Sequence, residues 1–135
     1  MLKSTTKQLS VSIFSLAALV LPGVAQATTI LDTSPLFANN GQSYHACNVA
    51  NVSSSPVALK VDMLDSSGVV IATSGAANIT LAAGKSTEIS HSNTYSGFAR
   101  CRFAFSVPSG DIRANMSVFH WTGAFYDTLA TSEAR

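Results

Sequence analysis

The stretch FARCRFAFSV, residues 98–107, decides the fold class of this chain because its side chains alternate strictly in character. One set is apolar throughout and comprises Ala99, Cys101, Phe103, Phe105 and Val107. The intervening positions carry Phe98, Arg100, Arg102, Ala104 and Ser106. Successive side chains of a β-strand point to opposite faces, so this period of two predicts a long strand with one buried face.

The same period recurs after residue 27, interrupted by turn residues about every ten positions. The segment Val57–Leu64 is the clearest further example, with Val57, Leu59, Val61 and Met63 on one face. Other strands are predicted at Thr29–Asp32, Ser43–Val52, Val69–Thr73, Ile79–Leu81, Thr87–His91 and from Ile112 onward. Seven to eight short antiparallel strands predict an all-β chain folded as a two-sheet antiparallel β-sandwich. The tail from Thr122 to Arg135 is compatible with a further strand or a frayed end.

The composition argues against several functional classes. The chain has 135 residues, of which 11% are charged, and a formal net charge of +1. It therefore forms one domain without the positive field that attracts nucleic acid. It contains no Gly-x-Ser-x-Gly, His-Glu-x-x-His or glycine-rich phosphate loop. We expect a protein that is not an enzyme and has no cofactor.

The first 27 residues are predicted to be a secretory signal peptide. Lys3 and Lys7 give a positive start, Leu9 to Val24 form an apolar stretch, and Ala25-Gln26-Ala27 offers small residues at the cleavage site. A retained membrane anchor is the alternative, although the apolar run is shorter than the roughly 20 residues of a spanning helix. Cleavage after Ala27 leaves residues 28–135 as a single β-sandwich domain, secreted or periplasmic and free of the membrane.

Cys47 and Cys101 lie on apolar faces of two predicted strands, 54 positions apart. In an oxidising compartment such a pair is expected to form a disulfide. A cysteine in the second strand and another in the penultimate strand resemble the inter-sheet bridge of immunoglobulin-like and fibronectin-III-like domains of small exported bacterial proteins. The match is architectural, and the third strand lacks the tryptophan of antibody domains, since the single Trp is Trp121. The resemblance implies a binding or structural module.

The residues around Pro108–Asp111 suggest an exposed recognition surface. A four-residue hairpin loop there would pair the two flanking strands and align their outward side chains. This register would place Phe98, Arg100, Arg102, Phe119 and Trp121 on one cation and aromatic platform. Such residue types are enriched at binding hot spots, so the platform is the predicted contact for a protein or surface ligand. The alternative is that cross-strand pairing or the tail covers the patch.

Three histidines give a second hypothesis. His45, His91 and His120 share inward parity, and an immunoglobulin-like strand order would bring them to one rim of the sandwich. Three imidazoles could hold zinc or copper there, although no metal-binding spacing motif is present and unrelated rim histidines are the simpler interpretation.

Taken together, these patterns predict an exported, non-enzymatic binding or structural module that acts on an extracytoplasmic partner. Two alternatives stay open: a periplasmic metal-binding protein that uses the histidine rim, and a subunit of a surface assembly that pairs through an exposed strand edge.

Overall fold

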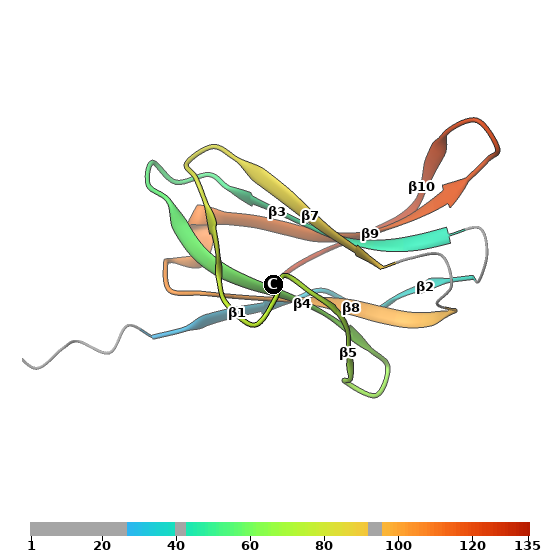
Figure 1. Ribbon diagram of the computed structural model, residues 1–135, viewed down its shortest axis with the longest axis horizontal. Helices are drawn as coiled ribbons and strands as arrows, with labels where there is room; N and C mark the ends of the chain where they lie inside the picture. Colours follow the sequence, from blue (N-terminus) through green and yellow to red (C-terminus); the bar gives the residue numbers. More distant parts are fainter. Residues whose placement is uncertain (1–26, 40–42, 92–95) are drawn as a thin grey trace, which may run out of the picture.

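Two antiparallel sheets make up the part of the chain that the computed structural model describes, residues 27–39, 43–91 and 96–135 (Figure 1). The predicted signal peptide lies outside these residues except for Ala27. Within them, no helix is long and apolar enough to span a bilayer. The predicted two-sheet antiparallel sandwich is confirmed.

The first sheet, here called the β4–β8 sheet, is built on two long central strands, β4 (Val57–Asp65) and β8 (Gly97–Phe105). Strands β1 (Thr29–Asp32) and β2 (Leu36–Ala38) follow one another along the free side of β8. Strands β5 (Val70–Thr73) and β6 (Ile79–Leu81) pair with the free side of β4. Both sides of β8 are therefore occupied.

The second sheet, here called the β3–β9 sheet, has the strand order β10-β9-β3-β7. Its members are β3 (Ser43–Asn51), β7 (Ser86–His91), β9 (Ile112–Trp121) and β10 (Tyr126–Glu133). The two sheets form the lower and upper layers in Figure 1. Strands β2 and β10 add to those predicted from the alternation.

The core lies between the sheets and consists of the inward members of the alternating strands. Phe103, Leu59 and Met63 of the β4–β8 sheet face Met116 of the opposite sheet, and each is completely buried. Burying one such side chain stabilises the fold by about 1.5–3 kcal/mol. The period-two pattern of the sequence therefore describes the contacts that hold the two layers together.

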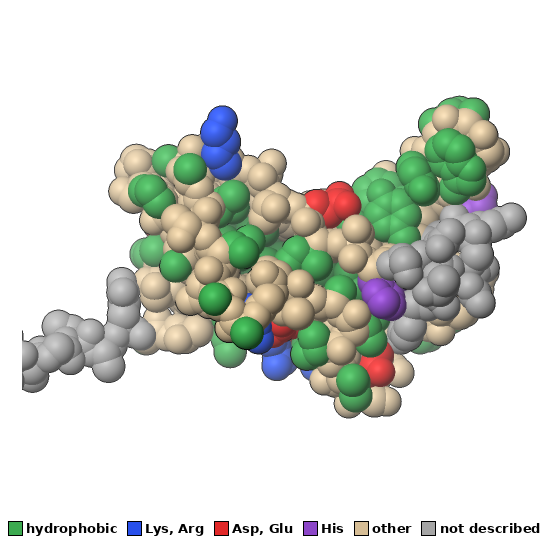
Figure 2. Space-filling view, in the orientation of Figure 1, with side chains coloured by type: hydrophobic (Ala, Val, Ile, Leu, Met, Phe, Trp, Pro, Cys, Tyr) green, Lys and Arg blue, Asp and Glu red, His purple; other side chains and the backbone are tan. Residues whose placement is uncertain are grey.

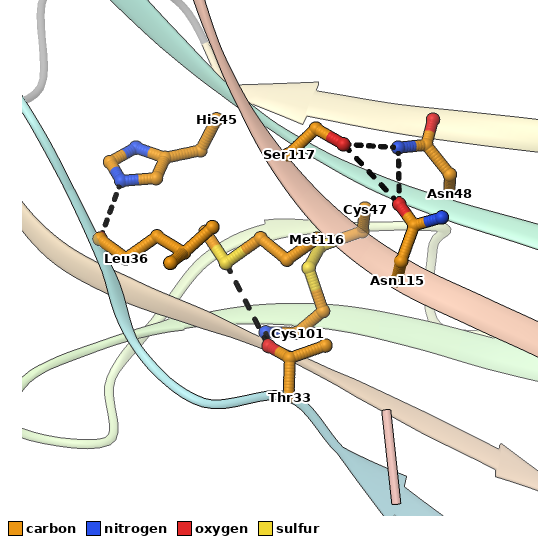
Figure 3. Close-up of a disulfide and its surroundings, with 9 residues drawn as sticks. All are labelled: Thr33, Leu36, His45, Cys47, Asn48, Cys101, Asn115, Met116 and Ser117. Carbon is orange, nitrogen blue, oxygen red and sulfur yellow. Dashed lines mark hydrogen bonds between the residues drawn. A yellow bond between two sulfur atoms is a disulfide. The ribbon is translucent and has the colours of Figure 1, made fainter. Parts of the chain in front are cut away.

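The predicted disulfide is confirmed and links the two sheets through the core. Cys47 of β3 and Cys101 of β8 are both fully buried, with their Cα atoms 5.7 Å apart. Thr33 packs beside the bridge, accepting a hydrogen bond from the Cys101 amide at 2.9 Å and donating to Met116 Sδ at 3.8 Å (Figure 3). The polar Thr33 hydroxyl is thus satisfied inside the sandwich.

The predicted hairpin between β8 and β9 is wrong, because the two strands belong to different sheets. After β8, Pro108 begins a tight turn in which the Asp111 amide donates to the Pro108 carbonyl at 3.0 Å. This turn carries the chain across the sandwich. Since β1, β2 and β4 already occupy the sides of β8, strand β9 pairs with β3 and β10 instead.

The C-terminal tail is a paired strand and not a frayed end. Strand β10 lies along β9, and its continuation crosses to the other sheet. The amides of Asp32 and Arg135 donate to each other's carbonyls at 3.2 and 3.1 Å, beside a bridge between Thr33 and Ala134. These bonds close one lateral edge of the sandwich.

Candidate ligand-binding face

The outward face of the β3–β9 sheet brings aromatic, amide and charged side chains together. Even-numbered residues of β3 and β7 and odd-numbered residues of β9 point away from the core, since the alternate residues of these strands are buried or partly buried against it. Strand pairing places these outward residues side by side. We distinguish an aromatic cluster and a polar cluster on this face. The aromatic cluster consists of Tyr44, Phe119, Trp121 and, from β10, Tyr126, and the polar cluster consists of Asn48, Asn115 and Ser117.

The aromatic cluster lies at the end of the sheet near the β9–β10 connection. Tyr44 and Phe119 are paired across β3 and β9, with stacked rings 5.1 Å apart. Tyr126 contacts Tyr44 edge-on at 5.1 Å and Trp121 at 4.8 Å. Because Trp121 is 44% exposed and Tyr126 is 54% exposed, the rings form a continuous surface that solvent or a ligand can reach.

The polar cluster lies next to the aromatic rings on β3 and β9. The Asn48 Nδ2 group donates to Asn115 Oδ1 at 3.0 Å and to Ser117 Oγ at 3.4 Å, and Ser117 Oγ also lies 3.3 Å from Asn115 Oδ1 (Figure 3). These bonds fix both amide orientations. Within the described ranges, no hydrogen bond engages Asn48 Oδ1 or Asn115 Nδ2, so one acceptor and one donor are left for a ligand.

A hollow of about 460 Å³ lies over the polar cluster, with Glu88 of β7 on one side and Arg113 of β9 on another. Its remaining lining consists of Asn48, Val49, Ala50, Ser86, Thr87 and Asn115. In Figure 2, the upper border of the molecule is hollowed beside the raised β9–β10 hairpin, with hydrophobic side chains gathered at the hairpin end. The face is therefore concave, with polar groups in the hollow and aromatic rings at one end.

A charged residue of the hollow, Glu88, acts electrostatically on Tyr44 of the aromatic cluster. Partial burial raises the pKa of Tyr44, and the negative charge of Glu88 raises it further, with a smaller contribution from Tyr126. The Tyr44 phenol therefore stays protonated at neutral pH and can donate a hydrogen bond. Arg113 is anchored by donating from Nη1 to the Gly110 carbonyl at 3.0 Å and the Ile112 carbonyl at 3.2 Å.

The structure divides the five residues of the predicted platform between the two sheets. Phe98, Arg100 and Arg102 lie on β8, whereas Phe119 and Trp121 lie on β9. The expected pairings across a hairpin do not occur, because β8 and β9 are not neighbours in a sheet. A single platform of these residues is therefore not formed.

The β8 residues of the predicted platform have partners within their own sheet. Phe98 is paired with Phe37, with ring centroids 5.1 Å apart. Arg102 makes two hydrogen bonds of 3.0 Å to the Asp32 carboxylate, which raises the pKa of the guanidinium. Arg100 lines a separate open depression with Phe98 and Asp65.

The histidines do not assemble into the expected metal group. His45 is buried and its Nε2 lies 3.0 Å from the Leu36 carbonyl, which fixes the ring inside the sandwich. His91 is opposite His45, and His120 is opposite Ser43 at the same end of the sheet. Across the described segments, no group of three or more His, Cys, Asp and Glu side chains could hold a metal ion. The His45 ring is committed to a backbone carbonyl, although strand pairing places His91 beside it.

Several residues of the candidate face escaped the sequence analysis, in particular Tyr44, Asn48, Glu88, Asn115 and Tyr126. Tyr44 and Asn48 occupy the outward positions of a correctly predicted strand, so alternation alone places them on the surface. Their neighbours come from β7, β9 and β10, and the order of those strands is a tertiary property.

Comparison with known proteins gives a fold likeness and no family. No family model matches the chain, and no curated protein matches it either. Among solved structures, the crystal structure of Thermotoga maritima 1070 is similar, with a TM-score of 0.55 and 10% sequence identity. The match covers 78% of this chain and 91% of that chain. At this identity the likeness concerns the arrangement of the strands only, so the chain is similar in fold to that protein.

Proposed function

We propose that this protein is an exported, non-enzymatic binding module that contacts an extracytoplasmic ligand through the outward face of the β3–β9 sheet. The observation that carries the proposal is the exposed aromatic cluster directly beside a polar cluster with an unused donor and acceptor. Binding sites typically combine aromatic surface with a few fixed polar groups that orient the ligand.

The opposite outer face supports this choice by contrast. There two ion pairs engage four charged side chains: Arg102 with Asp32 at 3.0 Å, and Lys60 with Asp62 at 2.9 Å. Thr73 also donates to the Asp62 carboxylate at 2.6 Å. These groups have satisfied partners within the chain, so they offer less to a ligand than Asn48 and Asn115 do.

Export is supported by the predicted signal peptide and by the buried disulfide. A structural disulfide persists in oxidising compartments and is rare in the reducing cytosol. The architectural resemblance to immunoglobulin-like domains of small exported bacterial proteins agrees with a binding module, as a fold analogy.

The test compares two aromatic pairs on opposite sheets. The mature protein is mixed with cell envelopes of the organism that produces it, and the bound fraction is measured after sedimentation. We expect Trp121→Ala/Tyr126→Ala to lose most of the binding, and Phe37→Ala/Phe98→Ala to bind like the wild type. The pairs are matched because both are exposed and each brings its rings to about 5 Å.

Thermal melts of both variants show whether each still folds. Loss of binding in the Phe37 and Phe98 variant, with retention in the folded Trp121 and Tyr126 variant, would move the binding surface to the β4–β8 sheet and overturn the proposal.

A further inference from the structure

We infer that the ligand of this face is a neutral carbohydrate chain, an assignment of ligand class that rests on the proposed function. Three independent features of the face lead to it: the aromatic rings, the unused hydrogen-bonding groups and the balance of charge.

The aromatic cluster presents ring surface of the kind that a pyranose covers. One face of a pyranose carries mainly C–H groups, which pack on an aromatic ring by dispersion and by their attraction to its negative face. Trp121 and Tyr126 are roughly half exposed and belong to neighbouring strands. Their rings, 4.8 Å apart, make one apolar surface at one end of the face. Trp121 and Asn115 are six residues apart on β9, about 20 Å along the strand, so a chain of several sugar units, and not a single sugar, could contact both clusters.

The polar cluster complements a pair of neighbouring hydroxyl groups. Asn48 Oδ1 can accept a hydrogen bond and Asn115 Nδ2 can donate one, while the bond from Asn48 Nδ2 to Asn115 Oδ1, 3.0 Å long, holds the two amides side by side. One hydroxyl of a sugar can donate to the first amide while the adjacent hydroxyl accepts from the second. An amide pair fixed in advance loses little side-chain entropy on binding.

The charges of the hollow favour an uncharged ligand. Among the lining residues that the structure describes, Glu88 is the one acid and Arg113 the one base, so their formal charges cancel. A polyanion would lie against the Glu88 carboxylate without an excess of positive charge to compensate. Neutral hydroxyl groups can accept a hydrogen bond from Arg113 and donate one to Glu88, and they are not repelled by the Glu88 carboxylate.

The arrangement also differs from that of a protein interface. Protein partners typically meet an apolar centre surrounded by a polar rim. Here the hydrogen-bonding groups lie in the hollow, and the aromatic rings lie to one side of it. A chain of hydroxylated rings fits this distribution better than an apolar protein patch.

The experiment uses Trp121, which is the single tryptophan of the chain and a member of the aromatic cluster. Its fluorescence is titrated with dextran, soluble starch, hydroxyethyl cellulose and galactomannan, and with dextran sulfate as the charged counterpart of dextran. We expect at least one neutral polymer to shift the emission, with an affinity that hardly changes between low and high salt because the ligand carries no charge. Failure of all four neutral polymers, or binding of dextran sulfate alone, would overturn the carbohydrate assignment.

Variants assign the binding to the two clusters. Tyr126→Ala and Asn115→Ala should each weaken binding of the responding polymer about tenfold, since each removes one kind of contact while Trp121 still reports. Phe37→Ala and Asn78→Ala, which alter exposed residues elsewhere, should bind like the wild type. Unchanged affinity in folded Tyr126→Ala and Asn115→Ala would show that the polymer binds elsewhere and would overturn the inference.

The carbohydrate assignment and the proposed function can fail separately. If all neutral polymers fail while envelope binding still depends on Trp121 and Tyr126, the face binds a ligand of another class and only the carbohydrate assignment is wrong. If envelope binding depends on Phe37 and Phe98 instead, the face itself is wrongly chosen. Concentration-dependent self-association that requires Trp121 and Tyr126 would identify a second copy of the chain as the occupant and overturn the carbohydrate assignment.

Discussion

Individual buried polar residues stabilise this fold because their side chains have hydrogen-bond partners inside it, as Asn51 shows. Asn51 is 1% exposed, yet its Nδ2 donates to the carbonyls of Ser55 and Leu81 at 2.8 and 2.9 Å. Its Oδ1 accepts from the Ser53 amide at 3.0 Å. One side chain thus joins the end of β3, the loop that follows it and β6 of the opposite sheet. Alternation in the sequence places Asn51 inward but cannot indicate these partners.

His45 should make the stability of the protein depend on pH. Burial lowers its pKa, the Leu36 hydrogen bond partly opposes this, and the charge of His91 lowers it further. The unfolded chain therefore takes up a proton at a higher pH than the folded protein does. The resulting stability is fully present above the unfolded pKa of about 6.5 and decreases as pH falls below it.

Urea unfolding between pH 7.5 and pH 5 measures this dependence. As the pH is lowered from 7.5 to 5, the free energy of unfolding should decrease in the wild type and in His120→Gln. The decrease should be smaller in His45→Gln. An equal slope in wild type and His45→Gln would assign the effect to other groups.

At the scale of the strand, alternation predicts structure well where one face is buried. The patterns of residues 57–64 and 98–107 correctly give β4, β8 and their inward sets, including Phe103 and Cys101. The short strand β2 was missed because Leu36–Ala38 lies between Ser34-Pro35 and Asn39-Asn40-Gly41, residues that are typical of turns and loops.

The pairing of strands could be predicted less well than the strands themselves. This explains why the predicted platform wrongly combined residues of β8 with residues of β9. A four-residue turn after Val107 is compatible with a hairpin and with a crossing between sheets. Which of these arrangements forms depends on which other strands pair with the two sides of β8. The competitors, β1, β2 and β4, are distant in sequence. Trp121 and Phe119 were correctly predicted to point outward, and Trp121 is exposed, but their neighbours Tyr44 and Tyr126 follow from the pairing of β9 with β3 and β10.

Removing strand β10 should destabilise the domain and make it associate. Deletion of residues 126–135 breaks the ladder to β9 and the closing bonds to Asp32, and it leaves the long edge of β9 unpaired. We expect a loss of about 3 kcal/mol or more in unfolding free energy, since each net backbone bond contributes about 1 kcal/mol. Exposed edges also pair with other chains, so size-exclusion chromatography should show oligomers that grow with concentration.

A shorter deletion, residues 134–135, is the control because it removes the closing bonds and one bond to β9, from Ala134 to Ala114, and spares the pairing of residues 126–133. It should cost less and leave the protein monomeric. If the longer deletion stays monomeric and equally stable, β10 does not protect the edge.

For the molecule as a whole, the Cys47–Cys101 disulfide joins two sheets that otherwise meet mainly through apolar contacts. It closes a loop with a sequence separation of 54, which in the chain-entropy account stabilises the fold by about 4 kcal/mol. Guanidinium unfolding of Cys47→Ala/Cys101→Ala should show a loss of about that size, a large part of the total stability of a small domain. Wild-type protein unfolded in reductant should give a similar value, and a loss below about 1 kcal/mol in both would show that core packing alone holds the sheets.

The hydrogen bonds between Asp32 and Arg135 also affect how quickly this protein can fold. They connect the first strand of the described chain with residues beyond its last strand, so the sandwich can close only after residues 126–135 have been synthesised. Contacts between such distant segments require large loops to form first, which slows folding. A growing chain would therefore present unpaired strands until residues 126–135 had been added, and its passage to the native state would depend on being kept extended until then.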